Sequence, residues 1–212
     1  ADDGALDLDS LVTEIDFCMR AGAHGLVVPV LASEAWTLTP DERGLVIRET
    51  IAGAGGRIPV VVGVSAETVA VSLRLAVDAE TAGADAVIAI APAECGGAED
   101  RVAEFYRALS DTVSLPIFIQ NVDPPYGARL DPVFVAKLVR EIPRVDWVKE
   151  ETSPPGWAMT AEIEGAGPKL RGVMGGVAGR YLMDEYRRGA CGFMPACEVT
   201  DIDVQIWNTL DG

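Results

Sequence analysis

The feature that most constrains the fold is a repeated unit in which an apolar run precedes a helix-like stretch. Seven runs rich in Val and Ile begin at intervals of roughly 20 to 34 residues, the size of one strand plus one helix. The runs span residues 24–30, 58–65, 86–92, 115–122, 145–151, 170–176 and 189–196. Each is nearly continuous in apolar residues, which is typical of parallel strands covered on both faces.

The sequence also predicts where the intervening helices begin and end. Gly22, Gly83 and Gly189 each lie between a helical pattern and the next apolar run, and glycine readily adopts the left-handed conformation that ends a helix. A first helix is predicted over residues 8–21. Further helix starts are predicted at Thr39-Pro40, at residues 65–67 and at Asp131-Pro132.

Seven strand–helix units in succession, without a break in composition, predict an α/β fold of the (β/α)₈ TIM-barrel type in one domain over residues 1–212. A doubly wound open sheet is the alternative, but no glycine-rich phosphate loop follows the first run. A barrel has eight strands and about 250 residues. We therefore expect this chain to be incomplete at both ends, without the first strand and without C-terminal helices.

Composition narrows the classes of partner. A formal net charge of -16, from 17 basic and 33 acidic residues, disfavours nucleic acid and anionic membranes. No apolar run is long enough to cross a bilayer, and no basic and apolar leader opens the sequence. The four cysteines are far apart and lack paired metal spacing, so free, buried thiols in a cytoplasmic protein are expected.

In a barrel the active site lies at the carboxyl ends of the strands, so the residues that close each run are the candidates. They include Ser33, Glu34, Glu94, Gln120, Asn121, Lys149, Glu151, Gly175, Gly176 and Glu198. The single histidine, His24, falls at the opposite end of its strand. Zinc-type metal chemistry and Ser/His/Asp catalysis therefore have no support, and no metal or cofactor is expected.

Lys149 is the most informative single residue. The chain has three lysines, and only Lys149 lies late in an apolar strand, on the same side as Trp147 and Glu151. A lysine held in a dry barrel loses its proton more readily, which makes its amine a nucleophile toward carbonyls. The alternative interpretation is a structural ion pair at the barrel mouth with Glu151 or Glu34.

Several motifs occur together in a recognisable order. They are Gly25-Leu26-Val27-Val28, Leu38-Thr39-Pro40-Asp41-Glu42-Arg43, Ile58-Pro59-Val60-Val61-Val62-Gly63-Val64, Ala82-Gly83-Ala84-Asp85-Ala86, Leu115-Pro116-Ile117 and Val148-Lys149-Glu150. In this order and spacing the chain resembles the dihydrodipicolinate synthase / N-acetylneuraminate lyase family over nearly all of its length. The resemblance implies that Lys149 forms an imine with a small-molecule 2-keto acid. It also implies a homo-oligomer, either a dimer or a tetramer.

Some positions depart from the family pattern. The usual Gly-Thr-Thr-Gly-Glu reads Val30-Leu31-Ala32-Ser33-Glu34, the catalytic tyrosine is replaced by Gln120, and the arginine for the second substrate falls near Pro125. Gln120 donates hydrogen bonds but cannot titrate. These departures resemble the branch that contains L-2-keto-3-deoxyarabonate dehydratase and favour dehydration of a 2-keto-3-deoxy sugar acid.

The resemblance also suggests roles around Lys149. Candidate proton carriers are Glu34, Glu94, Glu151 and Glu198. Candidate substrate contacts are Ala32, Ser33, Glu94, Asn121, Gly175, Gly176 and Glu198. The alternatives are retro-aldol cleavage, a dihydrodipicolinate synthase-type condensation with pyruvate, and a degenerate barrel that binds a keto acid without turnover.

Overall fold

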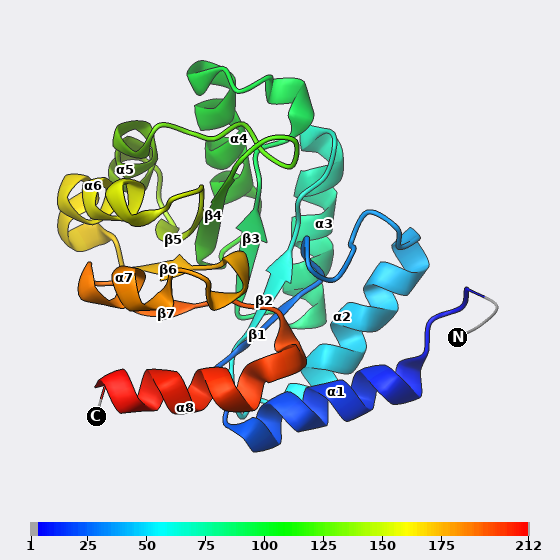
Figure 1. Ribbon diagram of the computed structural model, residues 1–212. Coiled ribbons are helices and arrows are strands. Elements are labelled where there is room, and N and C mark those ends of the chain that lie inside the picture. The colour runs from blue at the N-terminus through cyan, green and yellow to red at the C-terminus, as the bar shows by residue number, and fades with distance from the viewer. Residues whose placement is uncertain (1–3, 212) are drawn as a thin grey trace.

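Seven parallel strands form one curled sheet, and each strand is hydrogen-bonded to the next along the chain (Figure 1). The computed structural model describes residues 4–211 of the 212. The strands are β1 (Leu26–Val28), β2 (Val60–Gly63), β3 (Ala86–Ala89), β4 (Ile117–Val122), β5 (Val145–Glu151), β6 (Gly172–Gly175) and β7 (Gly192–Phe193). Every predicted strand run contains one of these strands, so the predicted order of strands is confirmed.

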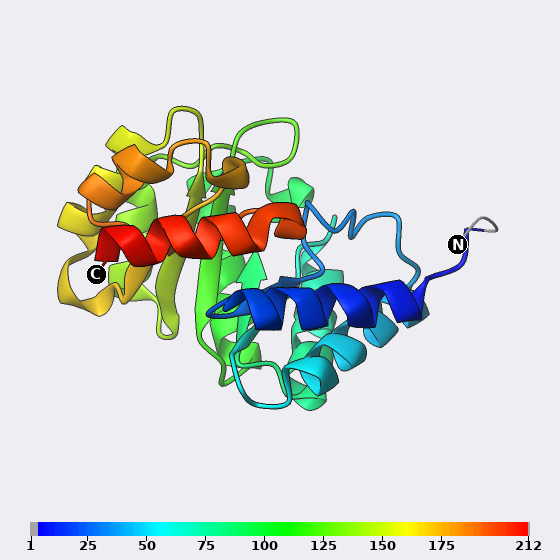
Figure 2. The same ribbon diagram turned by 60° about the horizontal axis from the view of Figure 1, so that its bottom comes forward.

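Eight α-helices alternate with the strands over the described residues. They are α1 (Leu8–Ala21), α2 (Pro40–Ala54), α3 (Val69–Ala82), α4 (Glu99–Thr112), α5 (Pro132–Glu141), α6 (Gly156–Ala166), α7 (Leu182–Arg187) and α8 (Thr200–Asp211). Helices α2 to α6 pack along the outer side of the sheet (Figure 1). Helices α1 and α8 lie side by side although they come from opposite ends of the chain (Figure 2).

The sheet is a half-barrel and not a closed (β/α)₈ barrel. Strands β1 and β7 are its two edges, and no hydrogen-bonded pair joins them within residues 4–211. Closing a parallel sheet of this curvature takes eight tilted strands, and seven leave the two edge strands apart. The predicted parallel α/β class is confirmed, and the curled sheet of seven strands is consistent with part of a (β/α)₈ barrel.

Both faces of the sheet are apolar, which explains the continuous runs. On the outer face, Val62, Val148 and Val173 are fully buried against the helices. On the inner face, Ile88 and Phe118 belong to a second buried cluster, and Phe118 stacks on Trp147 with ring centroids 5.1 Å apart. Strand alternation thus sends successive side chains into two different cores.

The helix ends predicted from glycines and from most of the capping residues are confirmed. Gly22, Gly83 and Gly189 have φ values of 91°, 94° and 97°, in the left-handed region. Thr39 and Glu42 form a reciprocal capping box at the start of α2. Asp131 caps α5 by accepting a hydrogen bond from the Val133 amide at 2.8 Å.

The start predicted at residues 65–67 is wrong. Helix α3 begins at Val69, and its cap is Thr68, whose hydroxyl accepts from the Val71 amide. The Ser65 hydroxyl instead accepts a hydrogen bond from the Ile90 amide at 2.9 Å, so it is bound to the chain that follows β3. A tertiary hydrogen bond therefore overrides the local capping preference.

All four cysteines are free, but their predicted burial is only partly correct. Cys18 and Cys95 are buried, Cys191 is exposed and Cys197 is half-buried. Within the described chain, no helix combines the length and apolar character needed to cross a membrane. The same residues contain no group of three or more His, Cys, Asp or Glu side chains arranged to hold a metal ion.

Helix α5 offers a matched test of the outer core. Leu138 is 1% exposed and Val133 is 62% exposed on the same helix. Leu138→Ala leaves a cavity and is expected to lower the free energy of unfolding by about 3 kcal/mol, whereas Val133→Ala changes it by less than about 0.5 kcal/mol. Urea unfolding measures both values. Equal losses in the two variants would contradict the packing described for this layer.

Candidate active site

Lys149 lies in β5 on the inner face of the sheet, directly beside Gln120 of β4. The two residues are register partners and are 5% and 2% exposed. The Lys149 Nζ atom is 3.1 Å from Glu151 Oε2, and Gln120 Nε2 donates to the same oxygen at 2.6 Å. A buried amine, an amide and a carboxylate therefore meet at the carboxyl ends of two adjacent strands, as strand alternation predicts.

The other oxygen of Glu151 is held by the loop that follows β6. The Val177 amide donates to Glu151 Oε1 at 3.2 Å. A side chain on Gly176 would overlap the Glu151 carboxylate, so the carboxylate keeps this place because position 176 is glycine. Glu151 thus connects β4, β5 and the end of β6 through three partners.

A second polar layer lies behind the sheet, on the side that faces the helices. Glu150 is fully buried and accepts hydrogen bonds from Asn121 Nδ2 at 2.8 Å and from the Thr152 amide at 2.7 Å. The Thr152 hydroxyl also donates to Glu150. The Asn121 side chain bonds the Leu130 amide and carbonyl as well, which ties the loop after β4 to the strand.

Glu162 of α6 completes this layer. Its carboxyl group is fully buried, and none of the described N–H groups donates to either oxygen. Burial raises the pKa of Glu162 well above its usual value, and the nearby Glu150 charge and a hydrogen bond to Glu150 raise it further. Glu162 therefore keeps its proton to a higher pH than an exposed glutamate does.

The loop after β1 holds three of the predicted residues at the surface. Ala32, Ser33 and Glu34 are exposed, and the Ser33 hydroxyl accepts from the Val30 amide at 3.4 Å. Glu34 has a positive φ of 48°. The sequence suggested an ion pair of Lys149 with either Glu151 or Glu34. Among the described residues, Lys149 pairs with Glu151.

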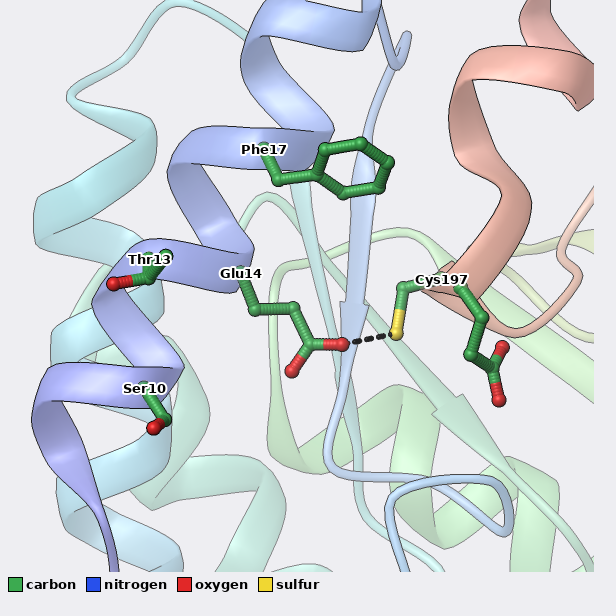
Figure 3. Close-up of a pocket in the computed structure, with 6 residues that line it drawn as sticks. Ser10, Thr13, Glu14, Phe17 and Cys197 are labelled. Atoms are coloured by element: carbon green, nitrogen blue, oxygen red, sulfur yellow. Dashed lines mark hydrogen bonds between the residues drawn. The ribbon is translucent and has the colours of Figure 1, made fainter.

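Glu94 and Glu198 contact other parts of the fold. Glu94 accepts a hydrogen bond from the Val69 amide and so binds the first turn of α3. Glu198 lies in the short turn before α8 and lines a surface pocket against α1. Figure 3 shows this pocket, where the Cys197 thiol donates to Glu14 Oε1 at 2.6 Å. The structure therefore does not gather these two carboxylates around Lys149.

Two buried acids near the site escaped the sequence interpretation. Glu162 and Glu185 are 0% and 1% exposed, although both lie on helices. A signal existed for Glu162, since it shares a helix face with the buried Met159 and Ala166. A lone acid on an apolar face is the pattern that could have identified it.

Comparison with known proteins places this site in a family. The model of the Dihydrodipicolinate synthetase family matches residues 1–169. The chain belongs to this family. The resemblance drawn from the strand motifs is thereby confirmed, and Lys149 and Glu151 of this family member both fall inside the matched segment.

Two relatives of this chain are named for different activities. L-2-keto-3-deoxyarabonate dehydratase of Azospirillum brasilense is 32% identical over 197 residues, which cover 92% of this chain and 63% of that protein. A 4-hydroxy-tetrahydrodipicolinate synthase of Nitrosomonas eutropha is 32% identical over 151 residues, which cover 71% of this chain and 51% of that protein. The chain therefore spans only part of the length of both relatives.

Solved structures agree on the fold of this family member. A crystal structure of dihydrodipicolinate synthase superposes with a TM-score of 0.86 at 27% identity. The superposition covers 96% of this chain and 70% of that chain. The curled parallel sheet and its helices are therefore the fold of the family.

The buried carboxyl group of Glu162 makes stability depend on pH. Because the pKa of Glu162 is raised on folding, its contribution is fully present below the unfolded pKa and is lost as the pH rises toward the folded pKa. Glu162→Gln cannot ionise and still donates to Glu150. From pH 5 upward, its free energy of unfolding relative to wild type is expected to increase by up to about 1.4 kcal/mol per pH unit.

Urea unfolding between pH 5 and pH 8 measures this difference. Glu164→Gln is the control, because Glu164 is exposed on the same helix. Its difference from wild type is expected to stay constant with pH. A constant difference for Glu162→Gln as well would mean that Glu162 is ionised throughout.

Proposed function

We propose that this chain carries the catalytic lysine of a Schiff-base-forming lyase that acts on a 2-keto acid. The supporting observation is the environment of Lys149, whose amine is buried and lies within 3.1 Å of a carboxylate at the carboxyl end of β5. Lysines in such surroundings are rare without a functional role. Membership of a family of lyases and aldolases supports the same assignment.

The first chemical step is attack of the neutral Lys149 amine on C2 of the keto acid. Loss of water then gives a protonated imine, which acidifies the hydrogens on C3. Glu151 is placed to take the proton from the Lys149 ammonium, because the two groups are in direct contact. The Gln120 amide holds Glu151 in that position.

The second step separates the two lyase reactions. Removing a C3 proton gives an enamine, and a protonated C4 hydroxyl then leaves as water. Cleavage of the C3–C4 bond instead requires a base that removes the proton of the C4 hydroxyl. Gln120 cannot serve as that base, which favours dehydration, with Glu151 as the proton carrier.

The preferred substrate class is a 2-keto-3-deoxy sugar acid. Its support is the dehydratase relative, which aligns with 92% of this chain, together with glutamine at position 120. In this proposal the amides of Ala32 and Ser33 bind the substrate carboxylate at the mouth of the site. Gly175 and Gly176 shape its walls, and Glu34 remains a candidate contact. Asn121, which bonds Glu150 behind the sheet, Glu94, which bonds the first turn of α3, and Glu198, which lines the pocket against α1, are not part of the proposed site. Condensation with pyruvate is the second candidate, supported by the synthase relatives.

The assembly is part of the proposal. We propose that the curled sheet belongs to a closed (β/α)₈ barrel, that residues 1–212 form one domain, and that the protein is a cytoplasmic homo-oligomer without a cofactor. The superposition on the dihydrodipicolinate synthase structure supports the barrel, because 70% of that chain is matched. The acidic composition supports a small-molecule substrate over nucleic acid or membrane.

Reductive trapping tests the imine. With pyruvate and borohydride, and then with a panel of 2-keto-3-deoxy sugar acids, the wild-type chain is expected to gain one adduct on the peptide that contains Lys149. Lys149→Arg retains a positive charge beside Glu151 but cannot form an imine, so its adduct should disappear. Lys137→Arg, at an exposed lysine of α5, is the matched control and should still be trapped. An adduct that persists in Lys149→Arg would contradict the mechanism.

Glu151→Gln tests the proton carrier. The variant retains a hydrogen-bonding side chain but cannot exchange a proton, so kcat for dehydration is expected to fall by about a hundredfold or more. Imine trapping on Lys149 should persist at a reduced rate. Stopped-flow or coupled assays of product formation, run beside the trapping reaction, separate the two steps. Unchanged kcat would assign the proton transfer to another group.

A further inference from the structure

Glu185 of α7 is a buried acid that the proposed mechanism does not use. It is 1% exposed, and among the described residues no donor reaches either of its carboxyl oxygens. Its side chain points from the helix to the end of β6, where it packs directly against Gly175. A buried carboxyl group without a hydrogen-bond partner lowers the stability of the fold. The contacts of Glu185 therefore point to a role other than stability.

The backbone at Gly175 and Gly176 lies between two glutamates. A side chain on Gly175 would overlap the Glu185 carboxyl group, and a side chain on Gly176 would overlap the carboxylate of Glu151. Two adjacent glycines therefore allow one acid to approach from the helix side and the other from the site. Glu185 and the partner of Lys149 therefore approach the same stretch of main chain at adjacent residues.

The charges that face Glu185 are mostly negative. Glu150 and Glu151 contribute from β5, and Asp184 contributes from its own helix. Arg188 is the nearby cation, but it is paired with Asp184 at 2.7 Å on the exposed side of α7. From α6, Glu162 lies near Glu150, and its own pKa is raised by burial. Burial and then the three acids raise the pKa of Glu185 to about 7, so both of its protonation states are populated at neutral pH.

We propose that Glu185 is a positioning residue that sets the charge balance of the Lys149–Glu151 pair from behind the sheet. Ionised Glu185 stabilises a positive charge on Lys149, either the resting ammonium or the iminium of the bound keto acid. Protonated Glu185 favours the neutral amine. Because coupling between two sites is reciprocal, formation of a cation on Lys149 promotes release of the Glu185 proton. The part that concerns the iminium rests on the proposed function, whereas the part that concerns the ammonium does not.

Competitive acetylation with acetic anhydride tests the proposal without a keto acid. Mass mapping gives the reactivity of each lysine against pH, and the exposed Lys137 is an internal reference. In Glu185→Gln, the pH of half-maximal Lys149 reactivity should fall by about half a unit to one unit, the size expected for loss of one charge across partly buried protein. Lys137 should not shift. Glu164→Gln, an exposed acid on the neighbouring helix, should shift neither lysine.

A second variant controls for the possibility that Glu185→Gln misfolds. Glu185→Met is neutral and of similar length, and it should give the same shift, with folding checked by circular dichroism. An unshifted Lys149 profile in either folded variant would overturn the proposal. Pyruvate trapping of the same samples separates the two hypotheses. A shifted profile without any adduct supports the role of Glu185 and removes the Schiff base, whereas an adduct with an unshifted profile does the reverse.

Discussion

The carboxylate of Glu151 is the contact on which the site depends. One oxygen binds the Lys149 ammonium and the Gln120 amide, and the other accepts the Val177 amide. These partners come from β4, β5 and the loop after β6, so one side chain fixes the relative positions of three neighbouring strand ends. The arrangement requires glycine at position 176, since any side chain there would occupy the place of the carboxylate. Geometry at Lys149 is therefore a property of the sheet and not of one strand.

Three buried glutamates lie near this contact. Glu150, Glu162 and Glu185 are at most 1% exposed, and no described cation pairs with any of them. Burial of like charges is unfavourable, so protons must be retained on some of these groups. Burial raises the pKa of Glu162 well above its usual value and that of Glu185 to about 7. Buried ionisable groups that destabilise the fold are common at functional sites, because they shift the pKa of a reacting group.

Local patterns explain which parts of this structure could be predicted from sequence. The strands follow from apolar runs, and the ends at Gly22 and Gly83 follow from a backbone conformation that glycine adopts easily. The contact between Lys149 and Glu151 follows from strand alternation alone. The hydrogen bond that removes Ser65 from helix capping and the burial of Glu185 both depend on contacts between distant segments. No periodicity in the chain encodes them. The exposed position of Glu34 has the same origin, because a loop's path depends on what it packs against.

The replacement of a titratable group by Gln120 changes what the rest of the site must do. A phenol at this position both donates a hydrogen bond and exchanges a proton, whereas an amide only donates. In this structure the Gln120 amide donates to Glu151 and orients that carboxylate. In the proposed mechanism proton exchange then falls to Glu151, which contacts the amine itself. A carboxylic acid is well suited to protonate a leaving hydroxyl, and it is a weak base toward an unactivated one. In the proposed mechanism, a glutamine in place of a titratable group at position 120 therefore favours loss of water from the enamine.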